Sequence, residues 1–145
     1  MDKLFAGWLP WALLSAAFAA LTAVFAKIGI NGINSNLATL IRTLVILAVG
    51  AVFVTVTRSW QSPAGLSQKT WLFLILSGLA TGASWFCYFH ALKLGDAARV
   101  APVDKLSVVF VAVIATTVLG EKLAPANWLG VALIAAGSVL IAWRA

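Results

Sequence analysis

Residues 4–26, LFAGWLPWALLSAAFAALTAVFA, form a run of 23 residues without Asp, Glu, Lys or Arg. Another 23 uncharged residues separate Lys69 from Lys93, and 21 separate Lys122 from Arg144. A helix of about 20 apolar residues spans a hydrocarbon core of roughly 30 Å. The sequence therefore predicts an integral membrane protein. The first run exceeds the roughly 7–15 residues of a secretory signal core, so we expect it to be retained as a span.

Composition agrees with this class. Hydrophobic residues make up 63% of the chain and charged residues 10%, whereas soluble domains carry about 25% charged residues. The net charge is +6, but the basic residues stand singly at the ends of apolar runs, a pattern typical of membrane anchoring and not of nucleic-acid binding. Because there is one cysteine and one histidine, we expect no internal disulfide and no metal site. We also expect no cofactor.

Two shorter charge-free runs complicate the count of spans. Residues 43–57 and 106–120 contain 15 residues each, which is about 22 Å of helix and too short to cross. Extended backward to 37–57 and 100–119 they become long enough, but they then include charged residues. Pro102 would lie in the first turn of the second of these helices, where a proline costs little.

The sequence therefore predicts an all-α membrane protein, a five-helix transmembrane bundle forming one domain over residues 1–145. The helices are expected at residues 8–26, 37–57, 71–92, 100–119 and 127–143. The connections between them are short and carry the Gly, Asn, Ser and Pro residues that interrupt helices.

Basic residues at the helix ends do not select an orientation. One side would carry Lys3, Arg58, Lys69 and Lys122, and the other Lys27, Lys93, Arg99 and Arg144. The positive-inside rule assigns orientation from an excess of Lys and Arg on one side, and here the two sides are equal. This tie is either a small-number coincidence or a sign of dual topology. An odd number of helices matters here, since a second copy inserted the opposite way would supply the inverted repeat of many transporters. No two-fold repeat is visible inside the chain.

Three charged residues inside the predicted spans are the main functional signal: Arg42, Asp104 and Lys105. Ionisable residues in membrane helices are costly and commonly mark substrate or proton paths. Arg42 and Asp104 lie near the starts of helices that begin on the same side, so we expect them at similar depth. They form either a polar vestibule for substrate or a proton, or an ion pair that sets helix register. Lys27 would either snorkel to the interface or join this cluster.

The third predicted helix carries a polar stripe and two aromatic residues. Ser77, Thr81, Ser84 and Tyr88 share one face by their helical spacing. The stripe would line an aqueous path or make interhelical hydrogen bonds, and the adjoining Gly78–Gly82 pair favours the second interpretation. Trp85 and Phe89 would stack on a flat or cationic substrate, or pack within the bundle. His90 would relay protons or make a structural hydrogen bond.

Several segments carry a family resemblance. They are residues 99–107 (RVAPVDKLS), 118–123 (VLGEKL) and 128–137 (WLGVALIAAG), together with Arg42 and the Gly78–Gly82 helix. The chain resembles, over essentially its whole length, the EamA-type unit of the drug/metabolite transporter superfamily. Most members of that family carry ten helices as two inverted five-helix units. The resemblance therefore implies an antiparallel homodimer, similar in principle to the four-helix small multidrug resistance proteins.

The chain departs from those four-helix proteins in its first helix, which has no acidic residue and only Ser15 and Thr22 as polar groups. Their glutamate-based drug/proton exchange is therefore not implied. Asp104, the only acidic residue inside a predicted span, would have to replace that glutamate, or transport is not proton-driven.

The expected function is a secondary transporter, an exporter of small metabolites across the cytoplasmic (inner) membrane, with membrane lipids, a small-molecule substrate and a second copy as partners. The candidate site residues are Arg42, Asp104, Lys105, Tyr88, Trp85, Ser84, Thr81, Lys27 and His90. No nucleophile–base pair, phosphate loop or paired carboxylates indicate an enzyme. The alternatives are a flippase for a lipid-linked sugar, whose phosphate the basic cluster would hold, and a non-transporting scaffold or accessory subunit.

Overall fold

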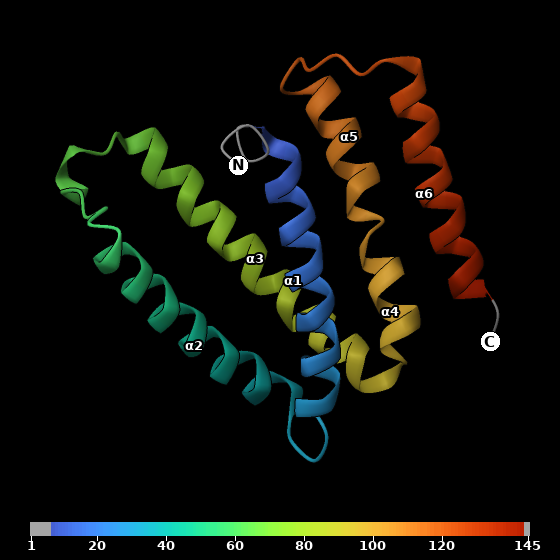
Figure 1. The fold of residues 1–145 in the computed structure, drawn as a ribbon, viewed down its shortest axis with the longest axis horizontal. Coiled ribbons are helices and arrows are strands. Elements are labelled where there is room, and N and C mark those ends of the chain that lie inside the picture. Colours follow the sequence, from blue (N-terminus) through green and yellow to red (C-terminus); the bar gives the residue numbers. More distant parts are fainter. Residues whose placement is uncertain (1–6, 144–145) are drawn as a thin grey trace. The chain divides into compact units, whose positions relative to one another are not determined.

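The computed structural model describes residues 7–143, and within that range all regular structure is helical (Figure 1). The elements are α1 (Trp8–Gly29), α2 (Ser35–Val56), the short 3-10 helix η1 (Pro63–Gly65), α3 (Gln68–Leu94), α4 (Ala97–Asp104), α5 (Ser107–Thr117) and α6 (Pro125–Trp143). Five stretches are long and apolar enough to cross a membrane: α1, α2, α3, the pair α4–α5, and α6. For the described residues, the prediction of an all-helical chain with five helices long and apolar enough to span a membrane is confirmed. Lys3 and Arg144, used above in the charge comparison, lie outside this range.

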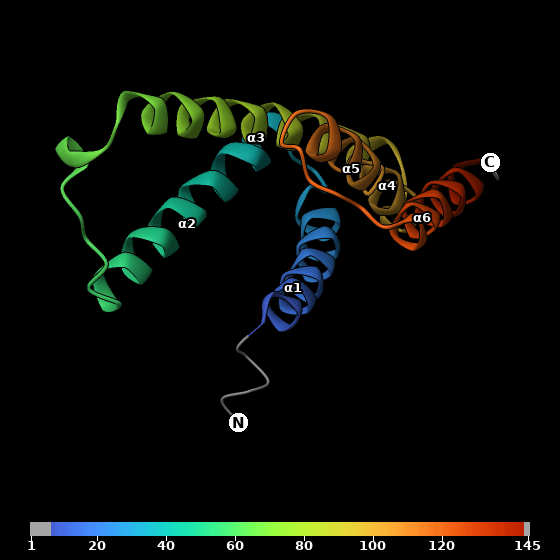
Figure 2. The same cartoon turned by 90° about the horizontal axis from the view of Figure 1, so that it is seen from above.

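The described residues form two compact units. Residues up to Lys27 and from Leu94 onward form the first unit, and Ile28–Lys93 form the second. In the second unit, α2 and α3 converge where α2 begins and α3 ends, and they separate toward the loop that joins them (Figures 1 and 2). Burial follows this geometry. The buried residues of the two helices are Ser35, Ala38 and Thr39 near the start of α2, and Phe89 and Leu92 near the end of α3.

Local sequence explains where the helices begin. Asn34 caps α2, because its side-chain oxygen accepts a hydrogen bond of 2.8 Å from the main-chain N–H of Asn36. The helix predicted from the sequence begins at residue 37, but in the structure Ser35 and Asn36 already belong to α2. Gly32 makes the turn before the cap with a φ of +80°, a conformation that glycine adopts readily. Pro125 begins α6, since the first helical position needs no N–H donor.

In the first unit, α4 and α5 follow one another along α6 (Figures 1 and 2). The predicted continuous helix over residues 100–119 is therefore wrong in one respect: it is interrupted at Lys105 and Leu106. Across the interruption, the N–H of Leu106 donates to the carbonyl of Val103 at 3.0 Å, and that of Val108 to the carbonyl of Lys105 at 3.0 Å. These i to i−3 bonds are of the 3-10 type, and such a stretch inside a helix often marks a hinge.

The position of Pro102 is a second correction. The carbonyl of Asp96 accepts hydrogen bonds from the N–H groups of Arg99 and Val100, so the helix begins at Ala97, nearly one turn earlier than expected. Pro102 consequently lies inside α4 and not in its first turn. A proline inside a helix removes one main-chain hydrogen bond and crowds the carbonyl four residues earlier. The whole of α4 therefore precedes the interruption as a short, weakened segment.

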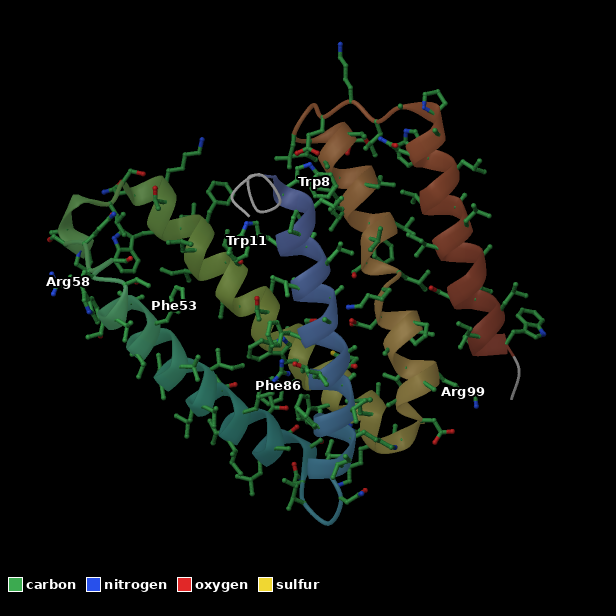
Figure 3. The ribbon with its side chains drawn as sticks, viewed as in Figure 1. Trp8, Trp11, Phe53, Arg58, Phe86 and Arg99 are labelled. Atoms are coloured by element: carbon green, nitrogen blue, oxygen red, sulfur yellow. The ribbon has the colours of Figure 1, made fainter. Side chains whose placement is uncertain are left out.

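Most of the helix surface is exposed in a single chain. Leu47, Leu79 and Phe110 are 68%, 66% and 66% exposed, and side chains project from all the helices in Figure 3. At Gly78 and Gly82, no heavy atom lies within 4 Å of an added Cβ, apart from near neighbours along the chain. The sequence favoured helix packing at this glycine pair. Such packing is not observed within the described chain. These surfaces are open to lipid or to another polypeptide.

Candidate functional site

The convergent end of α2 and α3 holds a cationic–aromatic cluster. The guanidinium carbon of Arg42, on α2, lies 4.3 Å from the centroid of the Trp85 ring and 5.4 Å from that of Phe89, both on α3. Both distances fall within the roughly 6 Å range of a cation–π interaction, for which tryptophan is the strongest partner. Trp85 and Phe89 are four residues apart, so one face of α3 presents both rings to Arg42. We call Arg42, Trp85 and Phe89 the Arg42 cluster.

The surroundings of Arg42 are apolar or already hydrogen-bonded. Phe89 is 3% exposed, and Thr39, one turn before Arg42, is 2% exposed. The Thr39 hydroxyl donates to the carbonyl of Ser35 at 2.9 Å, and the Thr43 hydroxyl donates to the carbonyl of Thr39 at 2.8 Å. Both hydroxyls therefore bond back to their own helix. Within its own unit, Ile28–Lys93, Arg42 has no hydrogen-bond acceptor and no carboxylate partner.

Charge composition strengthens this observation. The second unit, Ile28–Lys93, contains no Asp or Glu, whereas it contains Arg42, Arg58, Lys69 and Lys93. A guanidinium stays charged at all physiological pH values. The Arg42 cluster therefore places a permanent positive charge inside a membrane-spanning helix pair that has no negative side chain of its own.

Asp104 and Lys105 lie where α4 ends and the helix is interrupted. The Lys105 ammonium is 3.6 Å from an Asp104 carboxylate oxygen, and the two side chains are 55% and 39% exposed. The expected pairing of Arg42 with Asp104 joins two different units and stays a prediction. Asp104 is the only acidic residue within the five candidate spans of the described chain. Its position at an interrupted helix resembles the broken helices that hold binding sites in many transporters.

Three basic side chains donate to main-chain carbonyls near helix ends. Lys27, in the last turn of α1, donates to the carbonyl of Gly95 at 2.7 Å. Lys93, in the last turn of α3, donates to that of Ile33 at 2.8 Å. Arg99, labelled in Figure 3, donates to the carbonyl of Ala142 near the end of α6 at 3.2 Å. Positive charge at a helix C-terminus is favourable, so these residues hold turns and helix ends together.

The remaining candidate residues on α3 differ in their exposure. Thr81 donates to the carbonyl of Ser77 at 2.8 Å, so this hydroxyl bonds back to its own helix. Ser84 and His90 are exposed. Tyr88, three residues after Trp85 on the same helix, is half-buried.

Phe89 is not among the nine candidate site residues, although the sequence indicates that Phe89, like Trp85, would stack on a substrate or pack within the bundle. Phe89 follows Trp85 by four residues, the spacing that places two side chains on one helix face, and this signal was available in the sequence. What the sequence did not contain was the position of Arg42 over both rings.

Five helices long and apolar enough to span a membrane, two of them joined by a cationic–aromatic cluster, indicate a multi-pass membrane protein with a charged group inside a candidate span. The profile of the EamA-like transporter family matches residues 6–143, and the chain therefore belongs to that family. A Sinorhizobium sp. protein named "Uncharacterized transporter in cobO 3′ region" is 67% identical over 135 residues, which cover 93% of this chain and 96% of the relative. No solved structure matches the chain.

These findings confirm the family resemblance and make the chain a membrane transporter. The family and the relative's name both point to transport and away from enzymatic activity.

Proposed function

We propose that the chain is a secondary transporter that exports small metabolites across the cytoplasmic (inner) membrane as an antiparallel homodimer. The observation that carries this proposal is a single family unit with five candidate spans. Because five is odd, a second copy with the opposite orientation completes an inverted repeat around a central cavity, and rocking of the two halves gives alternating access.

Three further features support the dimer. The flanking basic residues are divided four against four between the two sides, which allows both orientations. Large apolar side chains are exposed on every span, and the surface at Gly78 and Gly82 is open. Small residues that allow close backbone approach are common at helix interfaces in membranes.

Orientation provides the test of the dimer. A reporter that is active only in the cytoplasm, and a second that is active only outside it, are fused in turn to the C-terminus. Both fusions are expected to be active in cells at comparable levels. Activity of one reporter alone excludes the antiparallel arrangement.

In this proposal Arg42, Asp104 and Lys105 supply the polar contacts with substrate, and Tyr88 and Trp85 line its path. Asp104 takes the role of the coupling carboxylate, because the described spans contain no other acid. A carboxylate that alternates between water and a partly dry site can carry a proton across the membrane.

Proteoliposomes test this role. A pH-sensitive dye inside the vesicles reports proton movement when a panel of amino acids, organic acids and amines is added. The Asp104→Asn variant is expected to abolish substrate-driven proton movement, whereas the loop variant Glu121→Gln leaves it unchanged. Equal coupling in Asp104→Asn and the unaltered protein removes Asp104 from the mechanism.

Two other functions have weaker support. A lipid-linked sugar flippase needs basic groups free to hold a phosphate, whereas Lys27, Lys93 and Arg99 each donate to a main-chain carbonyl. Dependence of transport on a lipid phosphate would favour it. A non-transporting accessory subunit predicts that apolar substitution of both Arg42 and Asp104 leaves every measured activity intact.

A further inference from the structure

We propose that the Arg42 cluster selects an organic anion, a metabolite with a carboxylate next to an apolar or aromatic group, and rejects organic cations. This inference rests on the proposed transport function and names the substrate class of the same site.

The first step of the argument is the unused hydrogen-bonding capacity of Arg42. A guanidinium carries five N–H donors. The rings of Trp85 and Phe89 offer their π faces to the charge but no oxygen or nitrogen acceptor at the contact. Within Ile28–Lys93, the unit that contains Arg42, no other group accepts a hydrogen bond from it. The N–H donors are therefore available to a bound ligand.

The second step is the source of a counter-charge. The unit that contains Arg42 has no acidic residue, and the described acids, Asp96, Asp104 and Glu121, all belong to the other unit. Asp104 is already paired with Lys105 at 3.6 Å. A planar carboxylate matches the fork of guanidinium donors and forms two parallel hydrogen bonds with it. An anionic ligand thus supplies what the unit itself lacks.

The third step concerns sign and shape. Aromatic rings often receive a cationic ligand, but here Arg42 lies over Trp85 at 4.3 Å and over Phe89 at 5.4 Å. A cationic ligand that binds to the ring faces of Trp85 and Phe89 would be repelled by the positive charge of Arg42, which already lies over them. An apolar group attached to a carboxylate, in contrast, can contact the ring edges while the carboxylate meets the guanidinium.

The test measures binding to the full chain in nanodiscs of zwitterionic lipid by calorimetry, with three probes of similar shape: benzoate, benzamide and benzylammonium. Benzoate is expected to bind about tenfold or more tightly than benzamide, as charge-assisted hydrogen bonds to an arginine predict, and benzylammonium is expected to bind most weakly. Equal affinities for benzoate and benzamide, or a preference for benzylammonium, overturn the proposal without any variant.

Variants then locate the site. Arg42→Ala is expected to reduce benzoate affinity to that of benzamide, and Arg42→Lys to restore part of it, because lysine keeps the charge but not the planar fork. The control is Arg58→Asn, since Arg58 has a φ of +53° that asparagine tolerates. Full benzoate selectivity in a folded Arg42→Ala protein overturns the proposal.

A lipid phosphate is the other source of an anion. Nanodiscs that contain an anionic phospholipid are expected to leave benzoate affinity unchanged. If the anionic lipid weakens benzoate binding only when Arg42 is present, the occupant is a lipid headgroup and the metabolite assignment is overturned.

The two proposals fail separately. Benzoate binding that depends on Arg42, without transport of any organic acid in proteoliposomes, supports the anion site and contradicts the transport function. Transport of neutral or cationic compounds, without selective benzoate binding, supports transport and overturns the anion site.

Discussion

The contact between Arg42 and Trp85 makes the most direct prediction, because its geometry is defined by one distance of 4.3 Å. A cation over a tryptophan face contributes about 0.5–1 kcal/mol at an exposed site and about 2 kcal/mol when desolvated. Arg42 is half-buried next to the buried Phe89, so we expect a coupling of about 1–2 kcal/mol. The Phe89 contact, at 5.4 Å and with a weaker ring, should contribute less.

A double-mutant cycle measures this coupling. Arg42→Met removes the charge and keeps an unbranched stem, and Trp85→Leu removes the ring and keeps an apolar side chain. The free energy of unfolding of both single variants and the double variant is measured in mixed micelles with increasing denaturing detergent. The loss of unfolding free energy in the double variant should be smaller than the sum of the losses in the two single variants. The difference is the coupling energy.

Trp71 provides the matched control. It is a tryptophan on the same helix, 44% exposed, and makes no cation–π contact with Arg42. The cycle of Arg42→Met with Trp71→Leu should be additive to within about 0.5 kcal/mol. If the Trp85 cycle is equally additive, the contact between Arg42 and Trp85 contributes no measurable coupling energy, and the stabilising cation–π interaction inferred from it is refuted.

Three further predictions concern turns and helix ends, all checked by the free energy of unfolding in the same detergent titration. Gly32→Ala should lose about 1 kcal/mol, because alanine is strained at a φ of +80° even though the space is open, whereas Gly50→Ala inside α2 should gain about 0.5 kcal/mol. Equal effects of these two changes would contradict the assigned turn. Asn34→Ala should lose about 1 kcal/mol with its cap, and Asn34→Ser should restore most of it. Lys27→Met should lose about 1.5 kcal/mol with the 2.7 Å bond to the Gly95 carbonyl, and unchanged stability would show that the bond does not hold the turn.

The spans were predictable because membrane crossing imposes a length and the apolar runs reveal it. Each predicted end lies within three residues of an end in the structure. The errors occur where caps decide the boundary, as at Asn34 and Asp96, whose contributions depend on main-chain geometry as well as on residue type.

The interruption at Lys105 and Leu106 was not predictable from breaker residues. Neither residue is a glycine or proline, and Pro102 acts mainly on the turn that precedes it. The change from i−4 to i−3 acceptors is a choice among main-chain carbonyls that differ little in energy.

Sequence alone determined the number of crossings and singled out Arg42, Asp104 and Lys105, because a charge in a long apolar run is conspicuous and costly. Tertiary structure alone decided that Arg42 lies over Trp85 and Phe89. The physical reason is that the apolar residues of α2 and α3 show only a weak helical period, so they do not tell which face of each helix meets the other. Only the way the two helices cross makes that choice.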